Sequence, residues 1–321
     1  MAKYIVGIDL GGMSAKGGLF TDNGTLLVCD KLKTDKSDGF EGTMQVLKRL
    51  TQLLVEKAGV CMDEVLAIGC GAPGVVDSRQ GVVLRWSNFD WNNQPLAERL
   101  SQLTGKPVRV ANDANAAALG EAKFGATASY QSSILLTIGT GIGGGIVFDG
   151  KLIEGYKSAG AELGHITIRE NGLPCGCGRK GCYEKYASAT ALVSQTRHAM
   201  VERLDSLMWD IAGGRVENAD GRTAFIAAAQ GDETAQKVIE QFVGYLSEGI
   251  ADFVNILRPE AIVLGGGIAN EGEALFEPLR KAVDQRSYIA MDIVPLKIVG
   301  AKLGNQAGIY GAYCLAMQND L

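Results

Sequence analysis

The segment D-L-G-G-M-S-A-K-G-G, residues 9–18, joins two strand-like runs. A second segment, T-I-G-T-G-I-G-G-G-I at residues 137–146, has the same setting. In each, a strand leads through a tight glycine turn into another strand, so the backbone N–H groups of the turn can line up toward an anion. Neither matches the P-loop pattern, and neither is a convincing dinucleotide fingerprint, which requires a following helix. A tight β-turn explains one such hairpin, but two indicate an ancient duplication with ATP held between the halves.

Strand-like and helix-like runs alternate along the 321 residues, which predicts a layered α/β protein. The length and a hydrophobic content of 46% suit two cores and therefore two domains. Apolar stripes with three- and four-residue spacing predict core-facing helices over Glu41–Ala58 and Glu233–Leu257. The predicted strands are Tyr4–Asp9, Gly18–Thr21, Thr25–Asp30, Val65–Gly69, Val108–Ala111, Ile134–Ile138, Gly145–Phe148, Ile262–Leu264 and Ile293–Ile298.

A third glycine cluster, Gly265, Gly266 and Gly267, closes a predicted strand and precedes a helix-like run. Bare backbone at this point permits close approach of a flat adenine or a ribose. A plain strand-to-helix turn is the alternative interpretation.

Asn112 and Asp113 lie where a predicted strand meets the Ala-rich helix predicted over Ala114–Lys123. A helix cap is the simple interpretation of an aspartate at this position. Ligands nevertheless collect at the strand ends of open α/β sheets. In phosphoryl transfer, an aspartate beside an alcohol can position the nucleophile and accept its proton. We therefore predict that Asn112 and Asp113 carry the reaction.

One histidine and three cysteines form the pattern H-x(9)-C-x-C-x(4)-C, with glycines between the thiols. Three thiolates and an imidazole complete a tetrahedral zinc site and leave no position for water or substrate. We therefore predict a structural zinc site of His165, Cys175, Cys177 and Cys182. Ordinary buried cysteines are the alternative. Disulfides are disfavoured, because the chain shows no signal peptide and seven cysteines is an odd number.

The net charge of −5 excludes a sequence-wide basic field, so we expect no nucleic-acid partner. No apolar run reaches the roughly 18–20 residues that a membrane-spanning helix needs. We expect a cytoplasmic protein without a membrane anchor.

The chain resembles the ROK family of sugar kinases, and within it the bacterial glucokinases, over Tyr4–Leu315. The matching motifs, in chain order, are D-L-G-G at 9–12, G-A-P-G at 71–74, N-D-A-N-A-A-A-L-G-E at 112–121, G-T-G-I-G-G-G at 139–145, E-L-G-H at 162–165, C-G-C-G-R-K-G-C-Y-E at 175–184 and L-G-N-Q-A-G at 303–308.

This resemblance implies a two-lobed, actin-like (ribonuclease H-like) α/β fold with a structural zinc loop and with sugar and ATP in the cleft. The expected small lobe is 1–115, joined by a C-terminal helix at about 306–321, whose core is roughly Gln306–Met317. The expected large lobe is 116–305 and carries the zinc loop 165–182. A homodimer is also implied.

The resemblance further implies ATP-dependent phosphorylation of a hexose 6-hydroxyl, with Asp113 as general base. Zinc would be structural, and the zinc-binding histidine would also touch the sugar through its other ring nitrogen, so zinc loss should reduce activity. The implied sugar-binding residues are Gly71, Asn88, Asn112, Asp113, Glu162, His165 and Glu184. The implied residues for ATP with Mg²⁺ are Asp9, Gly11, Gly12, Met13, Ser14, Thr140, Gly141, Gly143, Gly265, Gly266 and Gly267.

The chain departs from the family pattern D-x-G-G-T at Met13, where a threonine hydroxyl usually reaches a phosphate. Ser14 cannot simply replace it, because successive strand side chains point to opposite faces. Three explanations are that backbone amides suffice, that ATP affinity is lower, or that another phosphate donor is used. We favour the first.

Glucose is the predicted hexose, because the segment 81–91 resembles the glucokinase version of the sugar-side loop. N-acetylmannosamine, fructose, allose or a β-glucoside are the alternatives. Trp86 and Trp91 are interpreted as lobe-interface packing rather than as platforms for a sugar ring.

The sequence disfavours three other functions. A sugar-responsive repressor would carry a helix-turn-helix segment ahead of Asp9, where only eight residues stand. A non-catalytic sugar-binding relative is disfavoured by the intact Asp113. A nucleic-acid-binding zinc knuckle is disfavoured by the acidic charge.

Overall fold

The computed structural model describes residues 3–318 and has a mixed α/β architecture, which confirms the predicted fold class. It contains two compact units. The first comprises the described residues up to Ser132, Gly145–Ala161 and the described residues from Lys302 onward. The second comprises Ser133–Gly144 and Glu162–Ala301. Every helix within residues 3–318 is too short or too polar to cross a membrane.

The first unit is built on a five-stranded sheet with the order β3-β2-β1-β4-β8. Antiparallel pairing joins the first three strands, and parallel pairing joins β1, β4 and β8. The strands are β1 (Tyr4–Leu10), β2 (Ser14–Thr21), β3 (Leu26–Lys33), β4 (Val65–Ala72) and β8 (Val108–Asn112).

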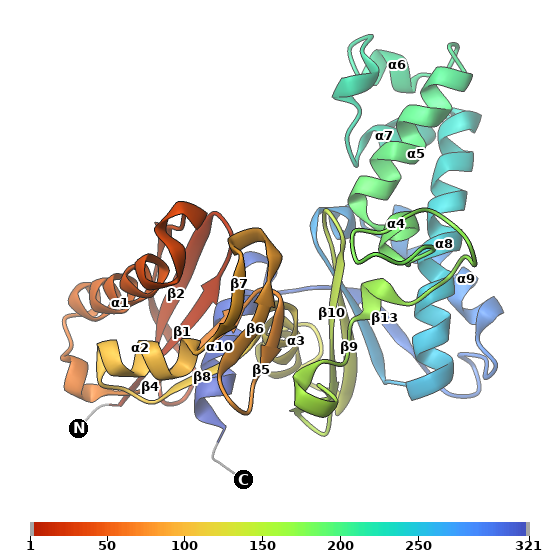
Figure 1. Cartoon of the computed structure of the whole chain (residues 1–321). Coiled ribbons are helices and arrows are strands. Elements are labelled where there is room, and N and C mark those ends of the chain that lie inside the picture. The colour runs from red at the N-terminus through yellow and green to blue at the C-terminus, as the bar shows by residue number, and fades with distance from the viewer. Residues whose placement is uncertain (1–2, 319–321) are drawn as a thin grey trace. The chain divides into compact units, whose positions relative to one another are not determined.

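Successive side chains of β1 point to opposite faces of this sheet, so they enter two different cores. Val6 and Ile8 belong to the core that includes α1 (Gly39–Ala58) and α2 (Leu96–Thr104). Ile5 instead packs with α3 (Asp113–Phe124) and α10 (Ala307–Met317). Figure 1 shows α1 and α10 beside this sheet.

Close packing of α10 against the sheet depends on glycine. A Cβ atom on Gly7 would lie 2.3 Å from the carbonyl oxygen of Ile309, and one on Gly69 would lie 1.8 Å from that of Ala312. Any side chain at these strand positions would therefore push the helix away. On the other face, the predicted stripe of α1 is buried, with Met44, Leu47, Leu50 and Leu54 at 0% exposure.

A small antiparallel sheet that the sequence did not predict completes the first unit: β5 (Val75–Asp77), β6 (Val82–Trp86) and β7 (Trp91–Gln94). Trp86 and Trp91 are buried in the core of this unit. The Trp86 ring stacks on Phe89 with centroids 3.9 Å apart and an interplanar angle of 8°.

The second sheet repeats the strand order of the first, as β11-β10-β9-β12-β13. Parallel pairing joins β9, β12 and β13, and antiparallel pairing joins β10 and β11. The boundary of the second unit falls within β10, after Gly144. The strands are β9 (Ser132–Ile138), β10 (Ile142–Phe148), β11 (Lys151–Leu152), β12 (Ala261–Gly265) and β13 (Lys297–Gly300).

The strand predicted over Ile293–Ile298 is wrong in its first half. Ile293 and Val294 both donate their N–H groups to the carbonyl of Ala290 in a turn. Pro295 has no N–H group to contribute to a strand ladder. The observed strand therefore begins two residues after the proline, at Lys297.

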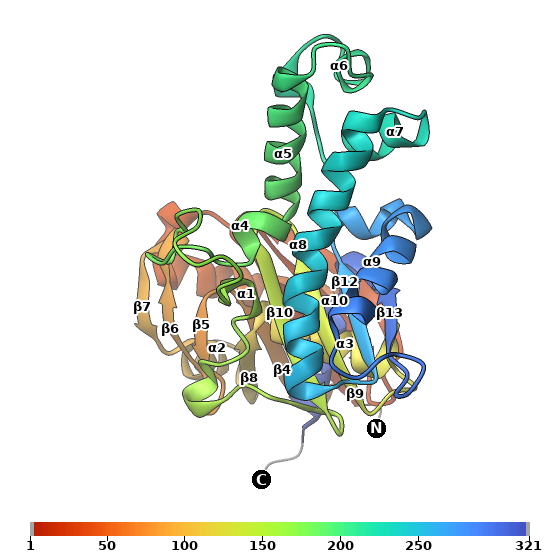
Figure 2. The same cartoon turned by 90° about the vertical axis from the view of Figure 1, so that its right-hand side faces the viewer.

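The longest helix of the second unit, α8 (Glu233–Leu257), has the predicted bounds. Its N-cap is Asp232, whose carboxylate accepts the N–H of Ala235 at 2.8 Å. In Figures 1 and 2, α5 to α7 and the start of α8 extend away from the sheet of this unit. The other helices are α4 (Glu184–Ala187), α5 (Ala189–Glu202), α6 (Met208–Ile211), α7 (Thr223–Ala229) and α9 (Glu273–Arg286).

Candidate active site and metal centre

The carboxyl ends of β1, β4 and β8 share one edge of the first sheet, because these three strands are parallel. Asp9 pairs with Gly71, and Gly71 pairs in turn with Ala111. A Cβ atom on Gly71 would lie 3.4 Å from the Cα atom of Asp113. The register therefore brings Asp9, Gly71 and Asp113, which are distant in sequence, to the same edge.

The residue that caps α3 is Asn112, not Asp113. The Asn112 Oδ1 atom accepts the N–H groups of Ala114 at 2.9 Å and Asn115 at 3.2 Å. Its Nδ2 group donates to the carbonyl of Gly74 at 3.0 Å. Asp113 accepts the N–H of Ala114 at 2.8 Å through Oδ1. Since Asn112 already performs the capping, the interpretation of Asp113 as a simple helix cap loses its basis.

Both carboxyl groups at this edge have a raised pKa. Burial raises the pKa of Asp113, and hydrogen bonds from the Ala114 backbone and the Asn112 side chain partly offset the shift. Burial also raises the pKa of Asp9, with a further increase from the charge of Asp113 and a decrease from Lys16. Lys16 lies opposite Asp9 in the β1–β2 register. The edge thus combines two desolvated acids with one cation.

The Asp9 carboxylate also lies against the first turn of α10. A Cβ atom on Gly308 would be 2.6 Å from the Asp9 Cγ atom, so only glycine leaves room for the carboxylate here. The positive end of the helix dipole favours a negative charge at this position.

The first glycine hairpin closes with the Gly11 N–H donating to the Ser14 carbonyl at 3.0 Å. Gly12 is exposed, and Met13 is 85% exposed. Within residues 3–318, the backbone N–H groups of Gly12 and Met13 have no hydrogen-bond acceptor. Exposed, unpaired amides on a glycine turn are suited to binding an anion.

The second glycine hairpin lies in the second unit and has a different support. The Gly139 N–H donates to the Gly141 carbonyl at 3.0 Å, and the Ala189 N–H donates to the Gly139 carbonyl at 3.0 Å. A Cβ atom on Gly141 would lie 2.4 Å from the Glu184 Oε2 atom. Thr140 is exposed at the tip, and Gly143 lies on β10. The start of helices α4 and α5 therefore holds this turn.

The third glycine cluster contacts the end of β9. Gly265 ends β12, and Gly267 begins a short 3-10 helix over Gly267–Glu271. Gly266 has a φ of +96°, and a Cβ atom there would lie 2.1 Å from the Ile138 carbonyl oxygen. Ile138 directly precedes the second hairpin, so the two glycine segments are neighbours within the second unit.

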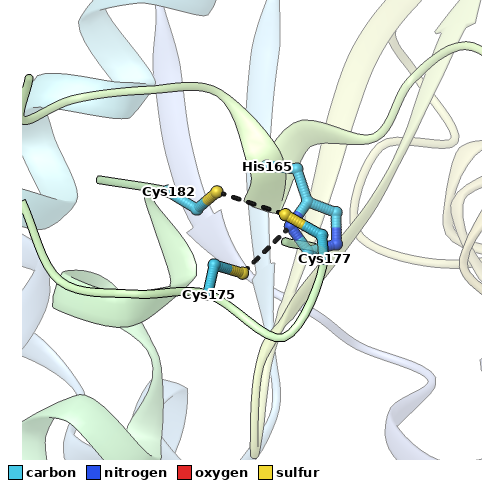
Figure 3. A group of neighbouring side chains, drawn as sticks. All are labelled: His165, Cys175, Cys177 and Cys182. Atoms are coloured by element: carbon cyan, nitrogen blue, oxygen red, sulfur yellow. Dashed lines mark hydrogen bonds between the residues drawn. The ribbon is translucent and has the colours of Figure 1, made fainter. Parts of the chain in front are cut away.

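The predicted zinc ligands converge in the second unit (Figure 3). The ligand atoms of His165, Cys175, Cys177 and Cys182 all lie within 4.8 Å of one another. The Sγ atoms of Cys177 and Cys182 are 3.6 Å apart, and the Cys175 Sγ atom is 3.7 Å from His165 Nδ1. We call the segment His165–Cys182 the metal knot.

The Cys177–Cys182 and Cys175–His165 distances fit a zinc ion. Zinc–ligand distances of about 2.0–2.3 Å in a tetrahedron place neighbouring ligand atoms roughly 3.4–3.8 Å apart. The three thiols and one imidazole are also the donor types that zinc prefers. Burial raises the pKa of the Cys175 thiol to about 12 in the metal-free protein, so metal binding would release a proton from it.

Backbone geometry lets the metal knot close tightly. Gly178 and Gly181 have φ values of +89° and +78°. A Cβ atom on Gly181 would lie 1.7 Å from the Arg169 carbonyl oxygen, so no other residue fits there. The Arg179 side chain donates to the carbonyl of His165 at 3.0 Å and to the hydroxyl of Thr167 at 2.7 Å, which ties the two halves together.

Three of the residues predicted to bind sugar lie at this knot. The His165 N–H donates to the Glu162 carbonyl at 3.0 Å. A Glu184 Oε1 atom lies 3.1 Å from the Cys175 Sγ atom and 4.0 Å from His165 Nδ1. Since Nδ1 faces the thiols, Nε2 is the ring nitrogen left for another partner.

The remaining predicted sugar-binding residues belong to the first unit. Gly71, Asn112 and Asp113 share the sheet edge described above, and Asn88 is exposed in a 3-10 helix over Ser87–Phe89. The sequence did not single out Lys16, which lies opposite Asp9, or Thr34, which contacts the first hairpin. No motif marks either residue, because their positions follow from strand register.

Two sheets with one strand order, each containing a glycine hairpin between antiparallel strands, place the molecule in the actin-like ATPase fold class. The chain belongs to the ROK family, whose family model matches residues 5–319.

Three relatives are similar to this chain over nearly its whole length. A glucokinase of Thermotoga maritima is 40% identical over 96% of this chain and 95% of its own length. A glucokinase of Streptomyces coelicolor is 36% identical over 98% of both chains. The crystal structure of a ROK family glucokinase from Streptomyces griseus, in complex with glucose and AMPPNP, has a TM-score of 0.81 at 34% identity and covers 98% of this chain and 100% of that one.

Proposed function

We propose that the protein transfers the γ-phosphoryl group of ATP to the 6-hydroxyl of a hexose, with glucose as the preferred substrate. The observation that carries this proposal is Asp113, a partly buried carboxylate at the sheet edge with a raised pKa. Its neighbour Asn112, not Asp113, caps helix α3. The glucokinase relatives support the choice of reaction and of sugar.

Asp113 is the proposed general base. As the sugar O6 attacks the γ-phosphorus, the O6–H proton passes to the Asp113 carboxylate, and the bond between phosphorus and the ADP oxygen breaks. A raised pKa makes this carboxylate a stronger base than an exposed aspartate while leaving it able to ionise. Mg²⁺ bound with ATP would neutralise phosphate charge.

The other proposed roles are sugar binding and nucleotide binding. The residues that would bind sugar hydroxyls are Gly71, Asn88, Asn112, Glu162, His165 and Glu184. The phosphate chain of ATP with Mg²⁺ would be bound by Asp9, Gly11, Gly12, Met13, Ser14, Thr140, Gly141 and Gly143, and the nucleoside by Gly265, Gly266 and Gly267.

A structural Zn²⁺ is proposed in the metal knot, held by His165, Cys175, Cys177 and Cys182. Four protein ligands leave it no open position, so its contribution would be to fix the loop. The second ring nitrogen of His165 would then face the sugar. We also propose a homodimer from the family resemblance, which light scattering of the purified protein tests.

Sugar-stimulated ADP release with Mg·ATP tests the proposed function. Glucose, N-acetylmannosamine, fructose, allose and a β-glucoside are compared at equal concentration, with a no-sugar control for ATP hydrolysis. Stimulation chiefly by glucose is expected. Stimulation by another sugar alone would replace glucose as the substrate, and silence on all five would refute a hexose kinase.

A further inference from the structure

The first glycine hairpin lacks the hydroxyl expected at position 13, yet its backbone is fixed by another threonine. Thr34 directly follows β3 and is 3% exposed. Its Oγ1–H group donates to the Gly11 carbonyl at 2.8 Å. Its N–H group donates to the Met13 carbonyl at 3.1 Å. One residue just after the end of β3 therefore holds two of the peptide planes of the turn.

These two hydrogen bonds determine which way the amides of the turn point. The Gly11 carbonyl and the Gly12 N–H belong to one trans peptide plane and point in opposite directions. Since the carbonyl is directed to Thr34, the Gly12 N–H is directed away from it. The second bond, at Met13, fixes the other side of the turn. The Met13 N–H lies between the two fixed planes and has no acceptor within residues 3–318.

The two hydrogen bonds from Thr34 matter because a glycine turn has many conformations of similar energy. Without Thr34, ordering the turn around a phosphate would cost conformational entropy at the moment of binding. With Thr34, the turn is already ordered, and the exposed amides need not reorganise. The ordered backbone amides would thus support phosphate binding. They would compensate for the contact that a threonine hydroxyl at position 13 would have made.

We propose that Thr34 is a positioning residue for the phosphate groups of ATP, acting by holding the turn Gly11–Ser14 in its phosphate-binding shape. This inference rests on the proposed function. It accounts for Met13 without a second phosphate donor.

The test compares T34V, which removes the O–H donor but keeps the N–H and the shape, with T34S, which keeps the hydroxyl. Thr51 provides a matched control. It is 0% exposed in the same unit, and its hydroxyl donates to the Leu47 carbonyl within α1 at 2.9 Å, away from the hairpin. T51V thus removes the same kind of buried hydrogen bond elsewhere in the unit.

Two readouts are measured on each full-length variant: KM for ATP and for glucose, and the Kd of AMPPNP with Mg²⁺ by calorimetry. T34V is expected to raise KM for ATP and Kd for AMPPNP about tenfold, because the Gly11 carbonyl loses its partner and the turn loosens. KM for glucose should change less than about twofold, and T34S and T51V should stay within about twofold of the parent protein for AMPPNP.

Several outcomes would overturn the proposal. These are an unchanged AMPPNP Kd in T34V, an equal rise of both KM values, an equal effect of T51V, or no AMPPNP binding by the parent protein. Because calorimetry needs no turnover, failure of the proposed function is separable: AMPPNP binding that weakens in T34V, without any sugar-stimulated ADP release, supports Thr34 and refutes the hexose kinase.

Discussion

The edge of the first sheet and the metal knot of the second unit are held in different ways. At the sheet edge, parallel strands and the start of α3 place Asp9, Asn112 and Asp113 through regular backbone hydrogen bonds. The knot instead has two isolated β-bridges, Thr167–Cys182 and Pro174–Lys180, and irregular loop hydrogen bonds around four side chains that point toward one another. The sheet edge is ordered by the fold itself, whereas we propose that the knot depends on a metal ion at its centre.

This difference predicts that the two regions fail separately, and Asp113 provides the strongest test. Replacing Asp113 by Asn removes the base but keeps the shape, so kcat should fall about 10³-fold. Zinc content and melting temperature should stay as in the parent protein, because the knot does not depend on this carboxylate. Steady-state kinetics and metal analysis measure both.

Asp252→Asn is the control, because the pKa of Asp252, an exposed residue on α8 of the second unit, is also raised, by desolvation and by the charge of Glu248. Its kcat should be close to that of the parent protein. Retention of turnover by Asp113→Asn would show that the base is another group.

Substitution of a ligand in the metal knot should have the opposite effect to Asp113→Asn. It should remove the metal directly and reduce activity as a consequence. Cys177→Ser removes one exposed thiol ligand, and Cys29→Ser is its matched control because Cys29 is also exposed. The first variant should lose bound zinc, and its sugar-stimulated rate should fall about 10–100-fold, as expected when residues around a site are no longer fixed. Elemental analysis and rates measure these effects.

Chelation provides an independent arm of the same prediction. Parent protein stripped of zinc should recover its rate when zinc is returned, whereas Cys177→Ser should not. Full activity of the stripped protein would contradict the proposed dependence of the sugar-binding residues on the knot.

The sequence predicted best those features that a local pattern determines. The convergence of His165, Cys175, Cys177 and Cys182 was predicted because a metal site restricts ligand type and spacing, while the zinc itself stays a prediction. Helix α8 was predicted because its apolar stripe is long. The strands β5 to β7 were missed because they are three to five residues long and carry no clear alternation. The start of β13 was misplaced because Pro295 was overlooked as a strand breaker.

Features that depend on pairing between distant segments could not be predicted from the sequence. Thr34 acts on a turn that strand register places beside it, and no spacing rule marks it. Likewise, the pattern at residues 112–113 was compatible with either residue as the helix cap. The structure assigns the cap to Asn112 by its backbone geometry, with φ −59° and ψ 146°, and by the two N–H groups that its side chain accepts.

The raised pKa of Asp113 predicts a smaller and continuous effect. The base must be ionised, so kcat/KM for the sugar should fall about tenfold per pH unit below that pKa. Since burial raises the pKa above 3.8, the fall should begin at a higher pH than for an exposed aspartate. A profile that stays flat down to about pH 4 would contradict the assignment.

The contribution of Asp113 to stability should change with pH in the opposite direction to its contribution to the rate. A carboxyl group with a raised pKa holds its proton more tightly in the folded than in the unfolded chain. Its contribution to the free energy of unfolding is therefore greatest below the ordinary pKa and is lost as pH rises through the folded-state pKa. Loss of rate on acidification would thus not reflect unfolding caused by Asp113, and melting temperatures recorded over the same pH range distinguish the two.

The smallest expected effect lies in the chain between the two regions, at Ala161, which precedes Glu162. Ala161 has a φ of +61°, a left-handed conformation that costs a non-glycine residue about 1–2 kcal/mol. Ala161→Gly removes that strain but loosens the unfolded chain, at a cost of about 0.4–1 kcal/mol. The free energy of unfolding should therefore rise by up to about 1.6 kcal/mol.

Ala159→Gly is the control, because Ala159 has a φ of −98° and its replacement by glycine should lower the free energy of unfolding. Denaturant titrations measure this free energy for both variants. Equal shifts would mean that backbone strain at Ala161 is not the cause.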